Sequence, residues 1–213
     1  MAKSVYVTAV IATIAILLIL FFSINVSESN RVYEFNEEIK QISLESTLQS
    51  AYSDFDSNNS EVYCLVMSQS IDNLSKRSFS LEKKLLAYQD ASFNTNEFYL
   101  AKRSFLITNM ILYRNFQKAQ EFCDVNKIPV LFFYAEDDSC QVECSLMGSQ
   151  LDLLSKECSS FRAFSFPYNW DSYEFTKILE VKYDINKAGT LIIGGEKILG
   201  PLSYSELKSK VGC

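Results

Sequence analysis

The stretch "IPVLFFYAEDDSCQVECSLMGSQ", residues 128–150, decides the fold that this sequence predicts. It opens with an unbroken apolar run of strand length, rich in Phe, Val and Tyr, which is typical of a buried parallel strand. Cys140 and Cys144 follow, four residues apart, at the expected start of a helix. Paired cysteines at such a place fit a redox centre, a metal site or a structural disulfide.

Downstream of this stretch, helix and strand patterns alternate to the end of the chain. Asp171 and Ser203 are favourable N-cap residues for the last two helices, and Gly194 and Gly195 mark a tight hairpin between the last two strands. The order β-α-β-α-β-β-α predicts an α/β fold. The periodicity and turn residues predict helices over residues 140–158, 171–185 and 203–211, and further strands over 161–169, 189–195 and 196–200.

Residues 28–126 show helical patterns instead. One apolar stripe ends at the turn-forming "DSNNS", residues 56–60, and two longer stripes flank the break "DASFNTN", residues 90–96. The longer stripes predict two helices that pack on each other as an antiparallel hairpin, with a face available to a membrane-protein partner. Such a hairpin would bring Cys64 and Cys123 together at its base, as a disulfide or as two small buried apolar side chains.

The N-terminus carries the longest apolar segment of the chain. Residues 5–24, "VYVTAVIATIAILLILFFSI", contain no charge and are long enough to cross a bilayer as a helix. A cleaved signal peptide is the alternative, but its apolar region would be shorter and would end in small residues. Lys3 precedes the span and several glutamates follow it, which predicts a cytoplasmic N-terminus and extracytoplasmic soluble domains. Six cysteines, an even number, then favour disulfides in an oxidising compartment.

Charge and composition argue against several classes of function. The chain has 20 basic and 26 acidic residues and no basic run, so it lacks the positive surface that nucleic acid requires. It has no histidine, which removes the commonest general base and the commonest zinc ligand. We therefore expect no nucleic-acid binding, no histidine-dependent hydrolysis, no cofactor and no resident metal.

The strand, the two-cysteine helix start and "GTLIIGGEKILG" together resemble the thioredoxin superfamily over residues 128–213. The resemblance implies a central mixed sheet flanked by helices, with the cysteines at the N-terminus of the first core helix. It implies that Cys140 is the nucleophilic cysteine and Cys144 the resolving cysteine. It also implies that Gly189 and Thr190 occupy the place of the family's cis-proline segment, beside the cysteines, where substrate binds.

The resemblance also has a consequence for the remaining cysteines. In this family's arrangement the first and last core helices lie on one face of the sheet and run in the same direction. Cys158 ends the first of these helices and Cys213 ends the chain, so the resemblance implies a structural disulfide between them. The alternative is two unpaired thiols.

The cysteine motif departs from the family pattern in three respects. Three residues rather than two separate the cysteines, carboxylates at positions 136, 137, 138 and 143 disfavour a thiolate, and Gly189 replaces the family's proline. The N-terminus of a helix acts in the opposite direction, because its dipole and free amides stabilise a thiolate. The motif is also similar to that of copper chaperones, and two thiolates with Met147 could hold Cu(I), although this chain lacks the chaperones' histidine.

The sequence thus predicts a membrane anchor over residues 1–27, a helical module over 28–126 and a thioredoxin-like domain over 127–213. The predicted function is thiol–disulfide exchange with extracytoplasmic proteins through Cys140 and Cys144. The alternative is a non-enzymatic interaction module on the same fold, with all six cysteines in structural disulfides.

Overall fold

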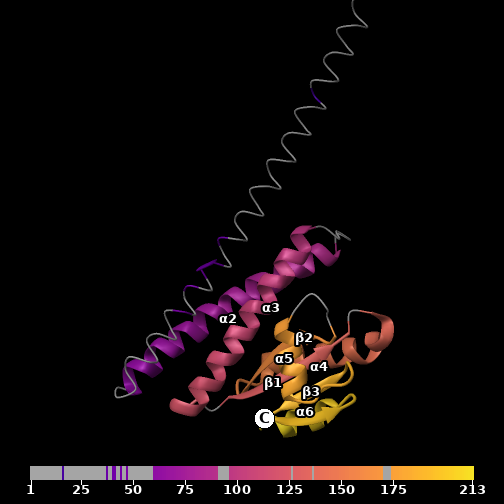
Figure 1. Ribbon diagram of the computed structural model, residues 1–213. Helices are drawn as coiled ribbons and strands as arrows, with labels where there is room; N and C mark the ends of the chain where they lie inside the picture. Colours follow the sequence, from indigo (N-terminus) through magenta and orange to yellow (C-terminus); the bar gives the residue numbers. More distant parts are fainter. Residues whose placement is uncertain are drawn as a thin grey trace, which may run out of the picture.

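The computed structural model describes residues 60–90, 96–125, 127–135, 137–169 and 174–213, together with six isolated positions before residue 60 (Figure 1). The predicted membrane anchor, the helix predicted to end near residue 56 and the predicted Asp171 cap lie outside these ranges. Within the described ranges, no helix is both long enough and apolar enough to cross a membrane.

The described chain begins with two long helices and continues with alternating strands and helices. From the first strand onward the order is the predicted one, and the α/β class is confirmed. Ser203 caps the last helix as predicted, in a reciprocal capping box with Glu206. In chain order the elements are α2 (Ser60–Asp90), α3 (Asn96–Phe122), β1 (Ile128–Tyr134), the 3-10 turn η1 (Asp138–Cys140), α4 (Gln141–Glu157), β2 (Phe161–Pro167), α5 (Glu174–Lys182), β3 (Thr190–Ile193), β4 (Glu196–Leu199) and α6 (Tyr204–Lys210).

The strands form one mixed sheet in the order β2-β1-β3-β4. β1 pairs in parallel with β2, to which it is connected through α4, and antiparallel with β3. β3 and β4 form a hairpin around the predicted turn at Gly194 and Gly195. The φ angles of these two residues are 57° and 89°, a region that glycine enters without the steric cost of a Cβ atom.

Helices cover both faces of this sheet (Figure 1). Alternate residues of β1 point to opposite faces, so Val130 and Phe132 pack with α4 and α6. Leu131 and Phe133 pack with α3 and α5 on the other face. A strand buried on both faces must be apolar at successive positions, which is why β1 shows a continuous run rather than an alternation.

Helices α2 and α3 form the predicted hairpin, which lies on one face of the sheet (Figure 1). The half near the sheet contributes Leu74, Leu112 and Phe116 to the core shared with β1, β2 and α5. The far half packs on itself through Leu81 and Ala101. The near half of the hairpin therefore shares a hydrophobic cluster with one face of the sheet, whereas the far half forms a cluster of its own.

The mixed sheet, the helices that flank it and the disulfides are compatible with a thioredoxin-like fold. In particular, α4 follows the central strand β1 and begins at the paired cysteines, and α4 and α6 pack on the same face.

Candidate functional site

Cys140 and Cys144 are joined by a disulfide at the N-terminus of α4, with their Cα atoms 5.3 Å apart. The chain leaves β1 at Tyr134, and the turn η1 then carries it into the helix. Cys140 is the last residue of η1 and the N-cap of α4, and Cys144 lies one helical turn further on. The spacing of four residues thus places both sulfurs on the same side of the helix end.

The turn that positions Cys140 is held by Asp137. Its carboxylate accepts a hydrogen bond from the Ser139 backbone N–H at 3.0 Å and another, short one from the Ser139 hydroxyl. These two bonds lower the pKa of Asp137, because they stabilise the ionised form. No side chain caps α4 at Cys140, and the Gln141 N–H, the first of the helix, donates to the Asp138 carbonyl.

Gly189 lies directly against Cys140. A Cβ atom at position 189 would stand 3.2 Å from the Cys140 Sγ and 3.9 Å from a carboxylate oxygen of Glu143. The φ angle of Gly189 is +76°, and its N–H donates to the Phe133 carbonyl at 2.8 Å. The positive φ favours glycine here, and a Cβ atom at this position would also force the sulfur to shift by a few tenths of an ångström.

Thr190 follows Gly189 as the first residue of β3, and it is fully buried. Its hydroxyl donates a hydrogen bond to the Lys187 carbonyl at 2.7 Å. The hydroxyl of Thr190 is thus bonded to the segment that leads into β3.

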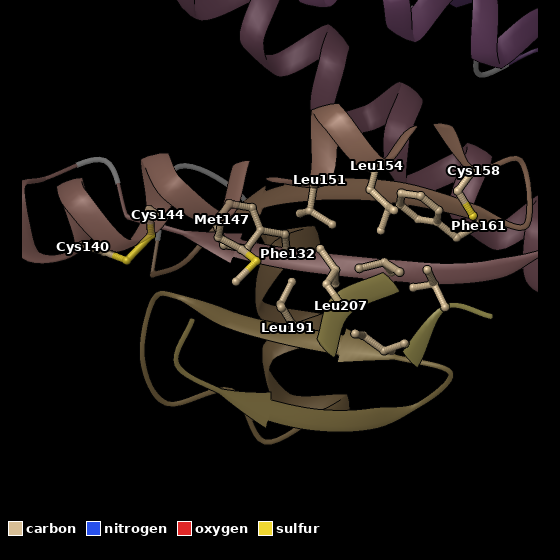
Figure 2. Packing of buried hydrophobic residues seen from close by; sticks show 13 residues of the cluster. Phe132, Cys140, Cys144, Met147, Leu151, Leu154, Cys158, Phe161, Leu191 and Leu207 are labelled. Carbon is tan, nitrogen blue, oxygen red and sulfur yellow. A yellow bond between two sulfur atoms is a disulfide. The ribbon is translucent and has the colours of Figure 1, made fainter. Parts of the chain in front are cut away.

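The disulfide is largely covered by protein. Cys140 and Cys144 are 5% and 8% exposed, and both belong to the hydrophobic cluster between α4 and the sheet. Figure 2 shows them at one end of this cluster and Cys158 at the opposite end, with Met147 beside them.

The surroundings of the cysteines combine a carboxylate with uncharged groups. The Glu143 side chain borders Gly189 on the same side as the Cys140 sulfur. Tyr134, at the end of β1, packs against the same cluster, and burial raises its pKa, so its hydroxyl stays neutral at physiological pH. Helix amides favour a thiolate at Cys140, whereas the Glu143 carboxylate opposes it.

The other four cysteines are joined in two further disulfides, and none of the six is free. Cys64 pairs with Cys123 at the base of the α2–α3 hairpin, and Cys158 pairs with Cys213 at the end of α4 far from Cys140. Their Cα separations are 5.6 and 6.0 Å, within the range of protein disulfides. The pairs are those that the hairpin geometry and the family resemblance suggested.

A metal site was the third interpretation of the cysteine pair. Met147, the extra ligand of the copper hypothesis, is buried in the same cluster as the two cysteines. Across the part of the chain that the structure describes, no three or more His, Cys, Asp or Glu side chains gather as metal ligands would.

A cavity beside β2 was not predicted from the sequence. It is lined by Glu82 of α2, Asp152 of α4 and Arg162 of β2, which are far apart in the sequence. The signal in the sequence was Arg162, a charged residue inside the apolar strand "FRAFSFP".

No protein-family model matches the chain, and no curated protein matches it significantly.

Proposed function

We propose that this chain exchanges disulfides with other proteins through Cys140 and Cys144. The observation that supports the proposal best is the position of the pair, in a disulfide at the N-cap of the helix that follows the central strand. At that position the amides of α4 stabilise a thiolate, which is the reactive form of cysteine. The close approach of Gly189 to Cys140 adds a backbone segment beside the sulfur, where a substrate chain would lie.

The exchange proceeds in two displacement steps. In the reducing direction, the Cys140 thiolate attacks one sulfur of a substrate disulfide, and the other substrate sulfur leaves as a thiolate. Cys144, once deprotonated, then attacks Cys140 in the mixed disulfide and releases the second substrate sulfur. The substrate gains two electrons, and Cys140 and Cys144 end as the disulfide. Oxidation of a substrate dithiol is the reverse sequence.

The proposed location is a membrane facing an oxidising compartment. The apolar residues 5–24 would act as a single-pass anchor with a cytoplasmic N-terminus. All six cysteines are paired, which is the usual state in extracytoplasmic proteins. The substrates would be extracytoplasmic proteins with thiols or disulfides.

The second candidate is a non-enzymatic interaction module in which the Cys140–Cys144 disulfide only stabilises the start of α4. The burial of both cysteines favours it, because a nucleophilic cysteine must be accessible. On this view the α2–α3 hairpin, with exposed Leu86 and Tyr99, would bind a membrane partner.

Redox titration separates the two candidates. The full-length chain in detergent is equilibrated in graded glutathione buffers and alkylated, and the state of each cysteine is determined by peptide mass spectrometry. For an exchange protein, Cys140 and Cys144 change state together within the range of cellular oxidoreductases, while the other four cysteines stay oxidised. If all six resist reduction equally, the exchange function is wrong.

Variants provide the matched control. Cys140→Ser should abolish exchange with a model disulfide substrate and leave the circular dichroism spectrum unchanged. Cys64→Ala/Cys123→Ala, which removes a disulfide remote from Cys140, should retain exchange. Loss of exchange in both variants would show that overall stability, and not the nucleophile, had been measured.

A further inference from the structure

The outer edge of β2 offers unpaired backbone groups. β2 pairs only with β1 and ends the sheet, and no other strand in the described ranges pairs with it. The Ile128 N–H donates to the Ser160 carbonyl and the Tyr168 N–H donates to the Tyr134 carbonyl, each at 2.8 Å. In a parallel ladder every second residue bonds to the neighbouring strand, so the even-numbered residues of β2 face β1. The N–H and C=O groups of Phe161, Ala163 and Ser165 therefore point away from the sheet.

The backbone groups of Pro167, like those of these three residues, point away from β1. Its missing N–H lies on the free edge, where a proline does not interrupt the ladder to β1. A proline at an edge also blocks pairing with a further strand at that position. The part of the edge that can accept another strand is thus Phe161 to Ser165.

This open segment of β2 borders a cavity of about 620 Å³. The cavity lies between the α2–α3 hairpin on one face and α4 on the other, and its volume is within the range of ligand pockets. Gly148 of α4 lines it, and a Cβ atom at that position would meet nothing within 4 Å. A segment of chain added along this edge would therefore find space in the cavity. Apolar and small residues in the lining include Phe79, Phe105, Leu151, Ala163 and Ser165.

The charged residues that line the cavity indicate the sign of the charge that an added segment would carry. The Arg162 Nε is buried without a hydrogen-bond partner, and Glu82 influences Arg162 but forms no ion pair with it. Asp152 also lines the cavity, and it is paired with Lys156 at 2.7 Å. Lys127 lines the cavity and has no ion pair among the described residues. Two unpaired cations against one unpaired carboxylate leave an excess of positive charge, which an acidic ligand would neutralise.

We propose that this cavity binds an extended polypeptide segment of a partner protein, which pairs with β2 as an added strand and places an acidic side chain against Arg162. The N–H groups of Ala163 and Ser165 would donate to carbonyls of the segment, and the carbonyls of Phe161 and Ala163 would accept from its N–H groups. Main-chain pairing provides affinity in this mode, and the pockets beside the edge provide specificity.

This binding site is independent of disulfide exchange. Gly148, at one wall of the cavity, follows Cys144 by four residues, a rise of about 6 Å along a helix. A bound segment could therefore lie close to the disulfide, but the pairing with β2 requires no redox step.

The first test is amide exchange of the full-length chain in detergent micelles, measured by NMR. The free chain should exchange the Phe161, Ala163 and Ser165 amides rapidly and protect the Arg162 and Phe164 amides, which bond to β1. If the outward amides are already protected at low protein concentration, the chain covers its own edge. If they become protected only as the protein concentration rises, a second copy covers it. Either result would overturn the proposal.

The second test uses a fluorescein-labelled peptide of alternating threonine and valine with one central glutamate. Fluorescence anisotropy should show saturable binding, and the bound peptide should slow exchange of the outward amides. Ser165→Pro removes an outward N–H without affecting the bonds to β1, so it should weaken binding at least about tenfold. Ser165→Ala, which retains that N–H, should bind as the natural chain does.

A second peptide and a third protein variant test whether Arg162 selects a negative charge. A peptide with lysine in place of the glutamate should bind more weakly than the first peptide, and the Arg162→Gln variant should show a smaller difference between the two peptides. Absence of binding, or equal binding by Ser165→Pro and Ser165→Ala variants with normal circular dichroism spectra, would contradict strand addition at β2.

Discussion

Glu143 carries a negative charge that opposes the proposed chemistry at Cys140. Its carboxylate and the Cys140 sulfur both border Gly189. A nearby negative charge disfavours a thiolate, so Glu143→Gln should increase the reactivity of reduced Cys140. We expect alkylation by iodoacetamide at neutral pH to accelerate by up to about tenfold, because the thiolate fraction rises when the carboxylate is removed. Glu157→Gln, at the far end of the same helix, is the control and should leave the rate unchanged. A rate unaffected by Glu143→Gln would mean that solvent screens this carboxylate from Cys140.

A second prediction concerns Gly189. It separates the cost of backbone strain from the cost of crowding between a new Cβ atom and the Cys140 sulfur. Gly189→Ala places a Cβ atom 3.2 Å from the Cys140 sulfur at a φ of +76°, whereas Gly200→Ala has a φ of +88° and no atom within 4 Å. Both variants should lose about 1–2 kcal/mol of unfolding free energy through strain, and Gly189→Ala should lose more. The comparison is made by urea denaturation with the Cys140–Cys144 pair oxidised and then reduced. Equal losses in both variants would show that the sulfur moves away at no cost.

At the scale of elements, a buried polar pair fixes how α2 and α3 meet. The Ser78 hydroxyl donates to the Asn109 side-chain oxygen at 2.7 Å, and both residues are 4% exposed. Asn109→Ala leaves the Ser78 hydroxyl without this acceptor and should lower the free energy of unfolding by about 1–3 kcal/mol. The double variant Ser78→Ala/Asn109→Ala should cost less than the sum of the two single variants. Additive costs in this double-mutant cycle would mean that the pair contributes no coupling energy.

The elements that the sequence predicted are those whose signals are local. Ser203 lies three residues before Glu206, and Gly194 and Gly195 are adjacent, so a capping box and a tight turn are visible in a few letters. The burial of Cys140 is different, because it depends on Gly189, which lies far along the chain and meets the sulfur only in the folded state. The position of a cysteine pair at the start of a helix was therefore predictable, whereas its accessibility was not.

At the scale of the whole molecule, the least predictable feature was the union of hairpin and sheet. A single apolar stripe on α3 explains its contact with α2, but Leu106, Tyr113 and Phe116 also pack with the sheet's aromatic core. Tyr113 and Phe116 both make edge-to-face contacts with Phe164 of β2. A helix buried on two sides resembles, in its sequence pattern, a helix with one broad apolar face. The sequence therefore did not show that part of the hairpin shares a hydrophobic cluster with the sheet.

This shared core makes the Cys64–Cys123 disulfide a restraint on the whole molecule rather than on the hairpin alone. Its cysteines are 59 residues apart in sequence, so in the chain-entropy model its loss destabilises the fold by about 4 kcal/mol. Cys158 and Cys213 are 55 residues apart, and the same model gives nearly the same value for their bond.

Unfolding of two double variants in urea tests this expectation. Each variant, Cys64→Ala/Cys123→Ala or Cys158→Ala/Cys213→Ala, should unfold in one transition, and the two should lose similar amounts of stability. Far-UV circular dichroism, dominated by the long helices, and fluorescence of the single tryptophan, Trp170, should report the same midpoint in each variant. If Cys64→Ala/Cys123→Ala instead separates the two signals, the hairpin melts independently and the contacts of α3 with the sheet are too weak to couple them.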